Sequence, residues 1–278
     1  MASRACSPNV KPARGGAEAL PAGLGIASAA LVLYISIPLA ALLLVVPPGR
    51  LVAQLGSQLA LRALGLSLRT TFFATVLVAA VGTPLAYLLA RGRFRGREVL
   101  DTLVDLPITI PPVVAGVALL LAFGRRGLLG QKLDLAGLQI PFTTLAVVMA
   151  QVFIASPFFV KAARAGFEAV DARLEAAART LGATRWRVFW TITLPLARPA
   201  VLSGLVLAWA RALSEFGATM MFAGNLPGRT QTLPLAVMTA LESDLDTAVA
   251  VSALSLFLAL LALLAAKWLA HRWSNTVA

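Results

Sequence analysis

Long uncharged stretches alternate with short basic segments along this chain. Residues 24–46 and residues 248–266 carry no charged side chain at all. A helix rises about 1.5 Å per residue, so about 20 residues cross the apolar core of a bilayer, which is roughly 30 Å thick. The pattern predicts an all-α polytopic membrane protein with about six transmembrane helices. We place these helices at residues 24–46, 68–90, 106–123, 142–160, 199–222 and 247–270.

The composition narrows the class of protein further. The chain has 278 residues, of which 59% are hydrophobic and 13% are charged, whereas soluble domains carry about 25% charged residues. The net charge of +12 comes from basic residues that lie between apolar stretches, which argues against a nucleic-acid-binding surface. With Cys6 as the one cysteine and His271 as the one histidine, we expect no metal site and no membrane-enzyme centre.

Lys and Arg are unevenly distributed among the segments that join these helices. If the N-terminus is inside, the inner segments hold 16 of these residues and the outer segments hold 6. Because cytoplasmic loops are enriched in Lys and Arg, the count predicts that both termini are cytoplasmic (N-in/C-in). We expect a flexible tail at 1–23, a transmembrane domain at 24–273 and a short tail at 274–278.

Prolines interrupt the third apolar stretch, which opens with DLPITIPPVVAG. Proline has no amide hydrogen to donate, and its ring disfavours the regular helix. Two interpretations stay open for Pro111 and Pro112. The segment is either a kinked element that lines a pathway, where freed carbonyls find partners, or a span that begins at one of these prolines.

The fifth predicted span contains two opposite charges, Arg211 and Glu215. Their i, i+4 spacing puts both on one helix face, and Thr219 lies one turn further along. Each charge costs about 2.5–3.5 kcal/mol at the bilayer centre on insertion scales, so neither is expected to face lipid. These three residues are candidates for a translocation pathway, and a structural ion pair is the alternative for the two charges.

The polar segment at about 161–198 is patterned more strongly than a simple connector. Five alanines between Phe167 and Leu181 favour a helix, Gly182 is a natural helix stop, and a second helix is expected over Trp186–Thr193. The sequence therefore predicts a helix, a glycine turn and a second helix at the cytoplasmic face. An amphipathic helix that lies on the lipid surface is the alternative.

Residues 175–195, EAAARTLGATRWRVFWTITLP, resemble the EAA loop of permease subunits of type I ATP-binding-cassette (ABC) importers. In that register Gly182, Ile192 and Pro195 match the pattern, but the loop glutamate falls at Ala176. Glu175, one residue earlier, is a candidate substitute. The resemblance implies a coupling helix that contacts an ATPase through Glu175, Ala176, Ala177, Ala178, Arg179, Leu181, Gly182 and Ala183.

A second stretch, residues 212–237 (ALSEFGATMMFAGNLPGRTQTLPLAV), is especially similar to molybdate permease subunits. The resemblance implies that the chain forms the pathway for molybdate. Molybdate and tungstate are tetrahedral dianions of nearly equal size, so both stay open as cargo, as do sulfate and thiosulfate. An ATP-independent channel or secondary transporter is the competing class, and neither would need the EAA loop.

The family also implies partners and a place in the cell. These are a second copy of the permease, two cytoplasmic ATPase subunits and a periplasmic or lipid-anchored substrate-binding protein, in the inner (cytoplasmic) membrane. The sequence has no G-x-x-x-x-G-K-[ST] phosphate loop. We therefore expect a transport subunit that is not an enzyme and binds no cofactor, with ATP-Mg used by the partner ATPase.

Overall fold

The computed structural model describes residues 22–274, and every regular element in that range is a helix. The chain divides into two units, Met1–Val45 and Val46–Ala278. The predicted tails at 1–23 and 274–278 lie almost wholly outside the described residues. In the first unit, α1 (Ala22–Leu44) is apolar on all sides, as expected of a helix surrounded by lipid.

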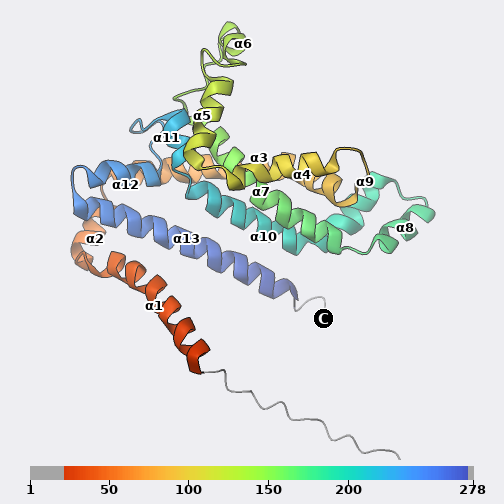
Figure 1. Ribbon diagram of the computed structural model, residues 1–278, viewed down its shortest axis with the longest axis horizontal. Coiled ribbons are helices and arrows are strands. Elements are labelled where there is room, and N and C mark those ends of the chain that lie inside the picture. Colours follow the sequence, from red (N-terminus) through yellow and green to blue (C-terminus); the bar gives the residue numbers. More distant parts are fainter. Residues whose placement is uncertain (1–21, 275–278) are drawn as a thin grey trace, which may run out of the picture. The chain divides into compact units, whose positions relative to one another are not determined.

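The second unit is a bundle of long helices with shorter ones at its ends (Figure 1). Of the long helices, α7 packs against both α3 and α10, and α10 packs against α13. The elements are α2 (Pro48–Leu55), α3 (Gln58–Arg91), α4 (Arg97–Thr109), α5 (Pro112–Phe123), α6 (Gly130–Leu135), α7 (Thr144–Ala169), α8 (Ala172–Thr180), α9 (Arg185–Val188), the π-turn η1 (Phe189–Thr193), α10 (Leu194–Leu213), α11 (Gly217–Ala223), α12 (Leu233–Leu241) and α13 (Leu245–Ser274).

Within the described residues, five helices are long and apolar enough to cross a membrane, and a bent pair raises the number to six. This confirms the predicted fold class and number of spans. Several predicted boundaries are wrong. The helix that contains the second predicted span, α3, begins at Gln58 rather than at 68. The helix that contains the fourth predicted span, α7, ends at Ala169 rather than at 160.

The third predicted span, 106–123, is not one continuous helix. It divides into α4 and α5, which meet at an angle of 117°. Ile110 is extended, with φ −80° and ψ 142°, because the ring of a following proline disfavours the helical conformation. Pro111 then caps α5, and Pro112 is its first residue, a position where the missing amide costs nothing. The third span is therefore bent at these prolines, and its second helix, α5, begins at Pro112.

The fifth predicted span, 199–222, is also wrong at both ends. The helix runs continuously from Arg185 to Leu213, through Pro195 and Pro199. The π-turn η1 precedes Pro195, and the amide of Leu194 bonds the carbonyl of Phe189. This wider turn accommodates a proline that cannot donate to the carbonyl four residues before it. The helix then breaks at Ser214, and α11 begins at Gly217.

Small residues bring α7 and α10 unusually close together. A Cβ built on Gly166 would lie 2.5 Å from the Cβ of Ala200, and one built on Gly204 would lie 2.8 Å from that of Ala162. Close backbone approach through small residues is the usual way in which helices associate in lipid. The backbones of α7 and α10 therefore lie in close contact along this face.

A capped turn precedes the last helix, α13. The carboxylate of Asp244 accepts hydrogen bonds from the amides of Asp246 and Thr247, and Asp246 also pairs with Arg50 at 3.3 Å. The pKa of Asp244 is lowered, chiefly by the hydrogen bond from the Thr247 hydroxyl. An acid at a helix N-terminus also interacts favourably with the helix dipole.

Candidate functional site: an exposed helical pair and a region of broken helices

The α8–α9 segment consists of the short helix α8, a tight turn, and α9, which is the first turn of the continuous helix that ends at Leu213. Asp171 caps α8 by accepting the amide of Arg173 at 2.9 Å. The turn after α8 has Gly182 at φ +88°, and the amide of Ala183 bonds the carbonyl of Ala178 at 3.0 Å. These contacts form a Schellman motif, which explains why glycine stands at this position.

The outer surface of this segment is well exposed and partly apolar. Leu181 is 89% exposed and Trp186 is 71% exposed. Ala176, Ala177, Arg179 and Gly182 also lie on the exposed side, whereas Ala178 and Ala183 are half-buried. Exposed large apolar side chains on a polar segment are typical of an interaction site.

Glu175 differs from its neighbours because it is buried, with 6% of its surface exposed. Its Oε1 atom accepts hydrogen bonds from Arg91 Nε at 3.1 Å and from the Thr193 hydroxyl at 3.0 Å. The sequence did not suggest either partner, because both lie far from Glu175 along the chain. The carboxylate therefore points into the protein, while Ala176, in the register of the loop glutamate, faces outward.

The breaks in the third and fifth spans lie next to each other. A Cβ built on Gly217, at the start of α11, would lie 3.0 Å from both the Cβ of Pro112 and the amide nitrogen of Val113. We call residues 110–112 and 211–219, which contain these breaks and the residues next to them, the break region. The structure thus brings together Pro112 and the segment that carries Glu215, which the sequence selected separately.

Arg211 and Glu215 form an ion pair in the break region, the arrangement that the sequence left open as the alternative to a pathway role. Arg211 Nη2 lies 3.2 Å from Glu215 Oε2, and the two side chains are 26% and 0% exposed. Glu215 Oε1 also accepts the amide of Ala218 at 2.7 Å. Thr219 is fully buried, and its hydroxyl has no hydrogen-bond partner among the described residues. One partly exposed cation therefore stands beside a carboxylate that is already paired.

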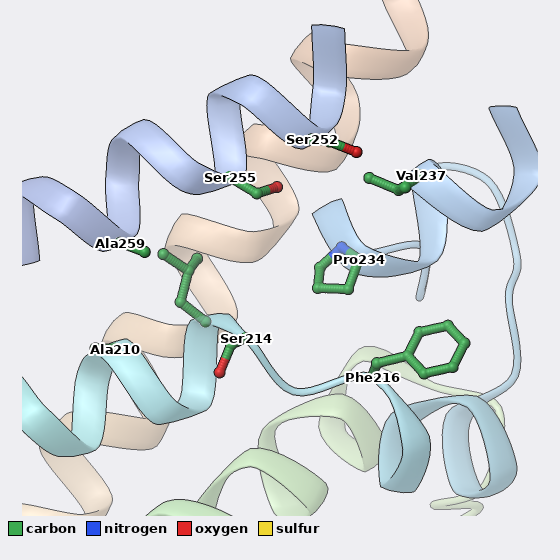
Figure 2. Close-up of a pocket in the computed structure, with 9 residues that line it drawn as sticks. Ala210, Ser214, Phe216, Pro234, Val237, Ser252, Ser255 and Ala259 are labelled. Atoms are coloured by element: carbon green, nitrogen blue, oxygen red, sulfur yellow. The ribbon is translucent and has the colours of Figure 1, made fainter. Parts of the chain in front are cut away.

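A groove of about 320 Å³ opens beside this region, between α10, α12 and α13 (Figure 2). Its walls are mostly apolar, with Phe216 and Pro234 on one side. Two of its serine hydroxyls, those of Ser214 and Ser255, donate to backbone carbonyls of their own segments. The groove therefore offers few free polar groups.

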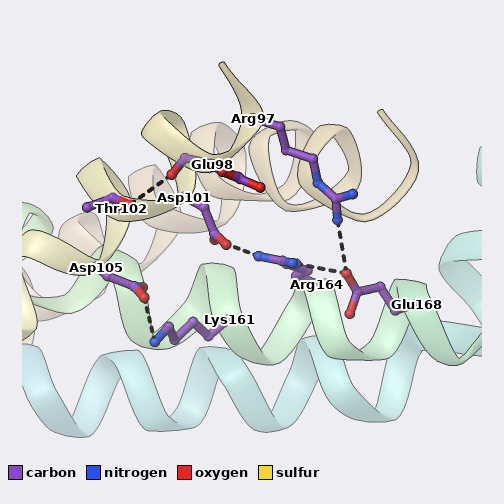
Figure 3. Close-up of polar contacts among 8 residues, drawn as sticks. All are labelled: Arg97, Glu98, Asp101, Thr102, Asp105, Lys161, Arg164 and Glu168. Carbon is purple, nitrogen blue, oxygen red and sulfur yellow. Dashed lines mark hydrogen bonds and ion pairs between the residues drawn. The ribbon is translucent and has the colours of Figure 1, made fainter. Parts of the chain in front are cut away.

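Four ion pairs join α4 to α7 or reinforce that contact (Figure 3). The pairs are Lys161 with Asp105 at 2.9 Å, Arg164 with Asp101 at 2.5 Å, Arg164 with Glu168 at 2.8 Å, and Arg97 with Glu168 at 3.5 Å. In the sequence, these Lys and Arg residues enter only the count from which the orientation is predicted. Helix α7 continues beyond its apolar part into this charged stretch, because acidic side chains on α4 neutralise the basic side chains of α7.

No group of three or more His, Cys, Asp or Glu side chains among the described residues is arranged to hold a metal ion. The candidate chemistry of this chain therefore rests on the exposed α8–α9 segment and on the charges of the break region.

Comparison with known proteins identifies similar chains. The family model described as "Binding-protein-dependent transport system inner membrane component" matches residues 82–275. The "Molybdenum transport system permease protein ModB" of Mycobacterium tuberculosis is 43% identical over 245 residues, which is 88% of this chain and 93% of that protein. The protein of the same name from Escherichia coli is 44% identical over 209 residues, 74% of this chain and 91% of its own.

A solved structure shares the fold. A bacterial ABC transporter "involved in the import of the acidic polysaccharide alginate" contains a chain that superimposes with a TM-score of 0.72. The alignment covers 90% of this chain and 94% of that one, at 17% sequence identity. At this identity the likeness concerns the fold alone, and it agrees with the arrangement of helices described above.

Proposed function

We propose a function from one premise: the chain belongs to the family of binding-protein-dependent transport system inner membrane components. It is a multi-pass membrane protein with the fold of an ABC importer permease. On that basis it forms the translocation pathway for molybdate. The observation that carries the choice of cargo is the 43% identity to a molybdenum permease over nearly the whole of both chains.

The α8–α9 segment is proposed as the surface that receives an ATPase subunit. The support is its position at one end of the bundle (Figure 1), its capped and rigid turn, and its exposed Leu181 and Trp186. The chain has no phosphate-loop motif of its own, so ATP-Mg would be bound and hydrolysed by that partner. A rigid element of this kind can pass a change of state between two sites.

The assembly that follows is a homodimer of this chain with two ATPase subunits and a substrate-binding protein. The break region is the proposed pathway, because interrupted helices are tolerated within a membrane where they line a cavity or are covered by protein. Its candidate residues are Pro111, Pro112, Arg211, Glu215 and Thr219. Arg211 is the partly exposed cation that an oxyanion would meet there.

Reconstitution tests this function directly. The chain, its ATPase and its binding protein would be placed in liposomes, and uptake of molybdate, tungstate and sulfate would be compared. We expect ATP-dependent molybdate uptake that vanadate abolishes. Uptake that persists when ATP hydrolysis is blocked would show that the chain is an ATP-independent channel or secondary transporter.

Gly182 gives a test of the α8–α9 segment itself. Left-handed backbone costs an L-residue roughly 1–2 kcal/mol, so Gly182→Val should distort the turn and lower the ATP hydrolysis that the loaded binding protein stimulates. Gly182→Asn, which tolerates this conformation better, should retain more of that stimulation. Gly137→Val is a matched control, because Gly137 also has positive φ (+73°) and open space around it. Equal loss in the Gly182 and Gly137 variants would contradict the assignment.

A further inference from the structure

One buried side chain of α8 bonds this helix to distant parts of the protein. Glu175 is the one residue of α8 whose surface is buried. Its neighbour Leu174 is 49% exposed and Ala178 is half-buried, so the helix buries little apolar surface of its own. A buried carboxylate is costly unless it is paired and hydrogen-bonded, and the contacts of Glu175 meet that requirement.

These contacts connect α8 to the ends of three long helices. Arg91 is the last residue of α3, and its Nη2 atom lies 3.0 Å from Glu175 Oε1. The same nitrogen donates to the carbonyl of Val170, the C-cap of α7, at 2.6 Å. Thr193, which donates to Glu175 at 3.0 Å, ends the π-turn that leads into α10. One carboxylate oxygen therefore stands where α3, α7, α8 and α10 meet.

We propose that Glu175 is a positioning residue that transmits movement of α8 to α3 and α10, through the cluster of Glu175, Arg91 and Thr193. The inference rests on the proposed function, in which the α8–α9 segment receives the ATPase. It differs from the expectation that Glu175 substitutes for the loop glutamate at the partner surface. Successive helix residues point about 100° apart, and here Ala176 takes the outward direction while Glu175 takes the inward one.

The cluster of Glu175, Arg91 and Thr193 is suited to transmitting movement because its few hydrogen bonds have defined directions. Hydrogen bonds to a charged group are stronger and more geometrically demanding than apolar contacts. Because α8 buries little apolar surface, it cannot shift without either carrying Arg91 and Thr193 with it or breaking these bonds. Loss of the carboxylate should therefore loosen α8 while leaving the α3–α7–α10 core intact.

The test uses the full transporter complex in lipid nanodiscs, with Glu175→Ala, Glu175→Gln and Arg91→Gln. A spin label at position 181 reports the mobility of α8, and ATP hydrolysis is measured with and without the loaded binding protein. We expect Glu175→Ala to raise label mobility and to cut the stimulation by about fivefold or more, the lower range of typical allosteric coupling.

Glu168→Gln is the matched control, because Glu168 is also a carboxylate paired with arginines, but it lies on α7. It should change neither label mobility nor stimulation. The double variant Glu175→Gln with Arg91→Gln should lose less stimulation than the sum of the two single variants, because both substitutions remove the shared Glu175–Arg91 contact. If the losses of stimulation in the two single variants add fully in the double variant, the proposal is overturned. Normal stimulation in Glu175→Ala would also overturn it.

The outcomes separate this inference from the proposed function. If the unmodified complex fails to associate with an ATPase or shows no stimulation, the proposed function fails. If the unmodified complex is stimulated and the Glu175 variants match it, the positioning role alone fails. Should Glu175→Ala not assemble, Glu175→Gln and the label mobility in the isolated chain decide the question, and unchanged mobility there overturns the role.

Discussion

Arg211 and Glu215 form a pair in which the two members have different surroundings. The glutamate side chain is fully buried, and it is held by both Arg211 and the amide of Ala218, whereas Arg211 is 26% exposed. Removing one partner of a buried pair leaves the other charge uncompensated. A simple arginine substitution therefore mixes a loss of stability with any loss of anion binding.

A double substitution separates these two effects. Arg211→Ala should destabilise the chain by about 1–3 kcal/mol, the usual cost of an unsatisfied buried group. Adding Glu215→Gln should restore most of that stability, because the buried charge is gone and the amide of Ala218 keeps its acceptor. If Arg211 contacts the anion, molybdate uptake by the double variant should stay reduced about tenfold, equivalent to about 1.4 kcal/mol.

The measurement combines thermal unfolding of the purified complex with uptake into liposomes. Glu215→Gln alone is the control, since it keeps the cation. Recovery of both stability and uptake in the double variant would identify a structural ion pair and remove Arg211 from the pathway.

At the scale of the helices, the contact between α7 and α10 depends on the absence of side chains. An alanine at position 204 would place its Cβ 2.8 Å from that of Ala162, and neither atom has a torsion that could relieve the overlap. Overpacking of this kind costs typically about 1–3 kcal/mol. Gly204→Ala should therefore lower the unfolding temperature of the chain in detergent.

The compensating change is available on the facing helix. Ala162→Gly combined with Gly204→Ala moves the small residue to the other side and should recover most of the loss. Gly65→Ala is the control in α3, because no atom lies within 4 Å of its added Cβ, and it should be neutral or stabilising. If Gly204→Ala is as stable as the control, the two helices do not depend on this close approach.

The sequence predicted helices well where composition alone decides them. The apolar lengths of α1 and α13 and the glycine stop at Gly182 were all evident from local pattern. The end of α7 was misplaced because Lys161 and Arg164 look like the end of a span. They continue the helix because Asp101 and Asp105 on α4 neutralise them, and a pairing between distant segments leaves no local signal.

In the candidate site, too, the sequence predicted features that depend on local spacing and missed those that depend on distant partners. The Arg211–Glu215 pair follows from i, i+4 spacing, and the sequence offered it as the alternative to a pathway role. The helix break after Leu213 was not predicted, because it depends on Glu215 turning to accept the amide of Ala218. Likewise, the sequence located Glu175 but could not show that Arg91 and Thr193 hold it inside the protein.

At the scale of the whole molecule, the orientation in the membrane is a prediction from charge alone. The 16 to 6 distribution of Lys and Arg places the α8–α9 segment inside the cell and the connection containing α6 outside. The proposed function requires this orientation, because an ATPase that uses cytoplasmic ATP must reach α8 from within. A test of sidedness is therefore also a test of the transport mechanism.

Two leucines with nearly equal exposure make that test well matched. Leu181, after α8, is 89% exposed, and Leu135, at the end of α6, is 90% exposed. Cys6 is the one cysteine, so Cys6→Ser gives a background into which Leu181→Cys or Leu135→Cys is introduced. In intact spheroplasts that lack the ATPase, a membrane-impermeant maleimide should label position 135 at once and position 181 only after permeabilisation. The reverse pattern would invert the topology and put the α8–α9 segment out of reach of any cytoplasmic ATPase, whereas labelling of both positions in intact cells would mean that the charge count does not fix the orientation.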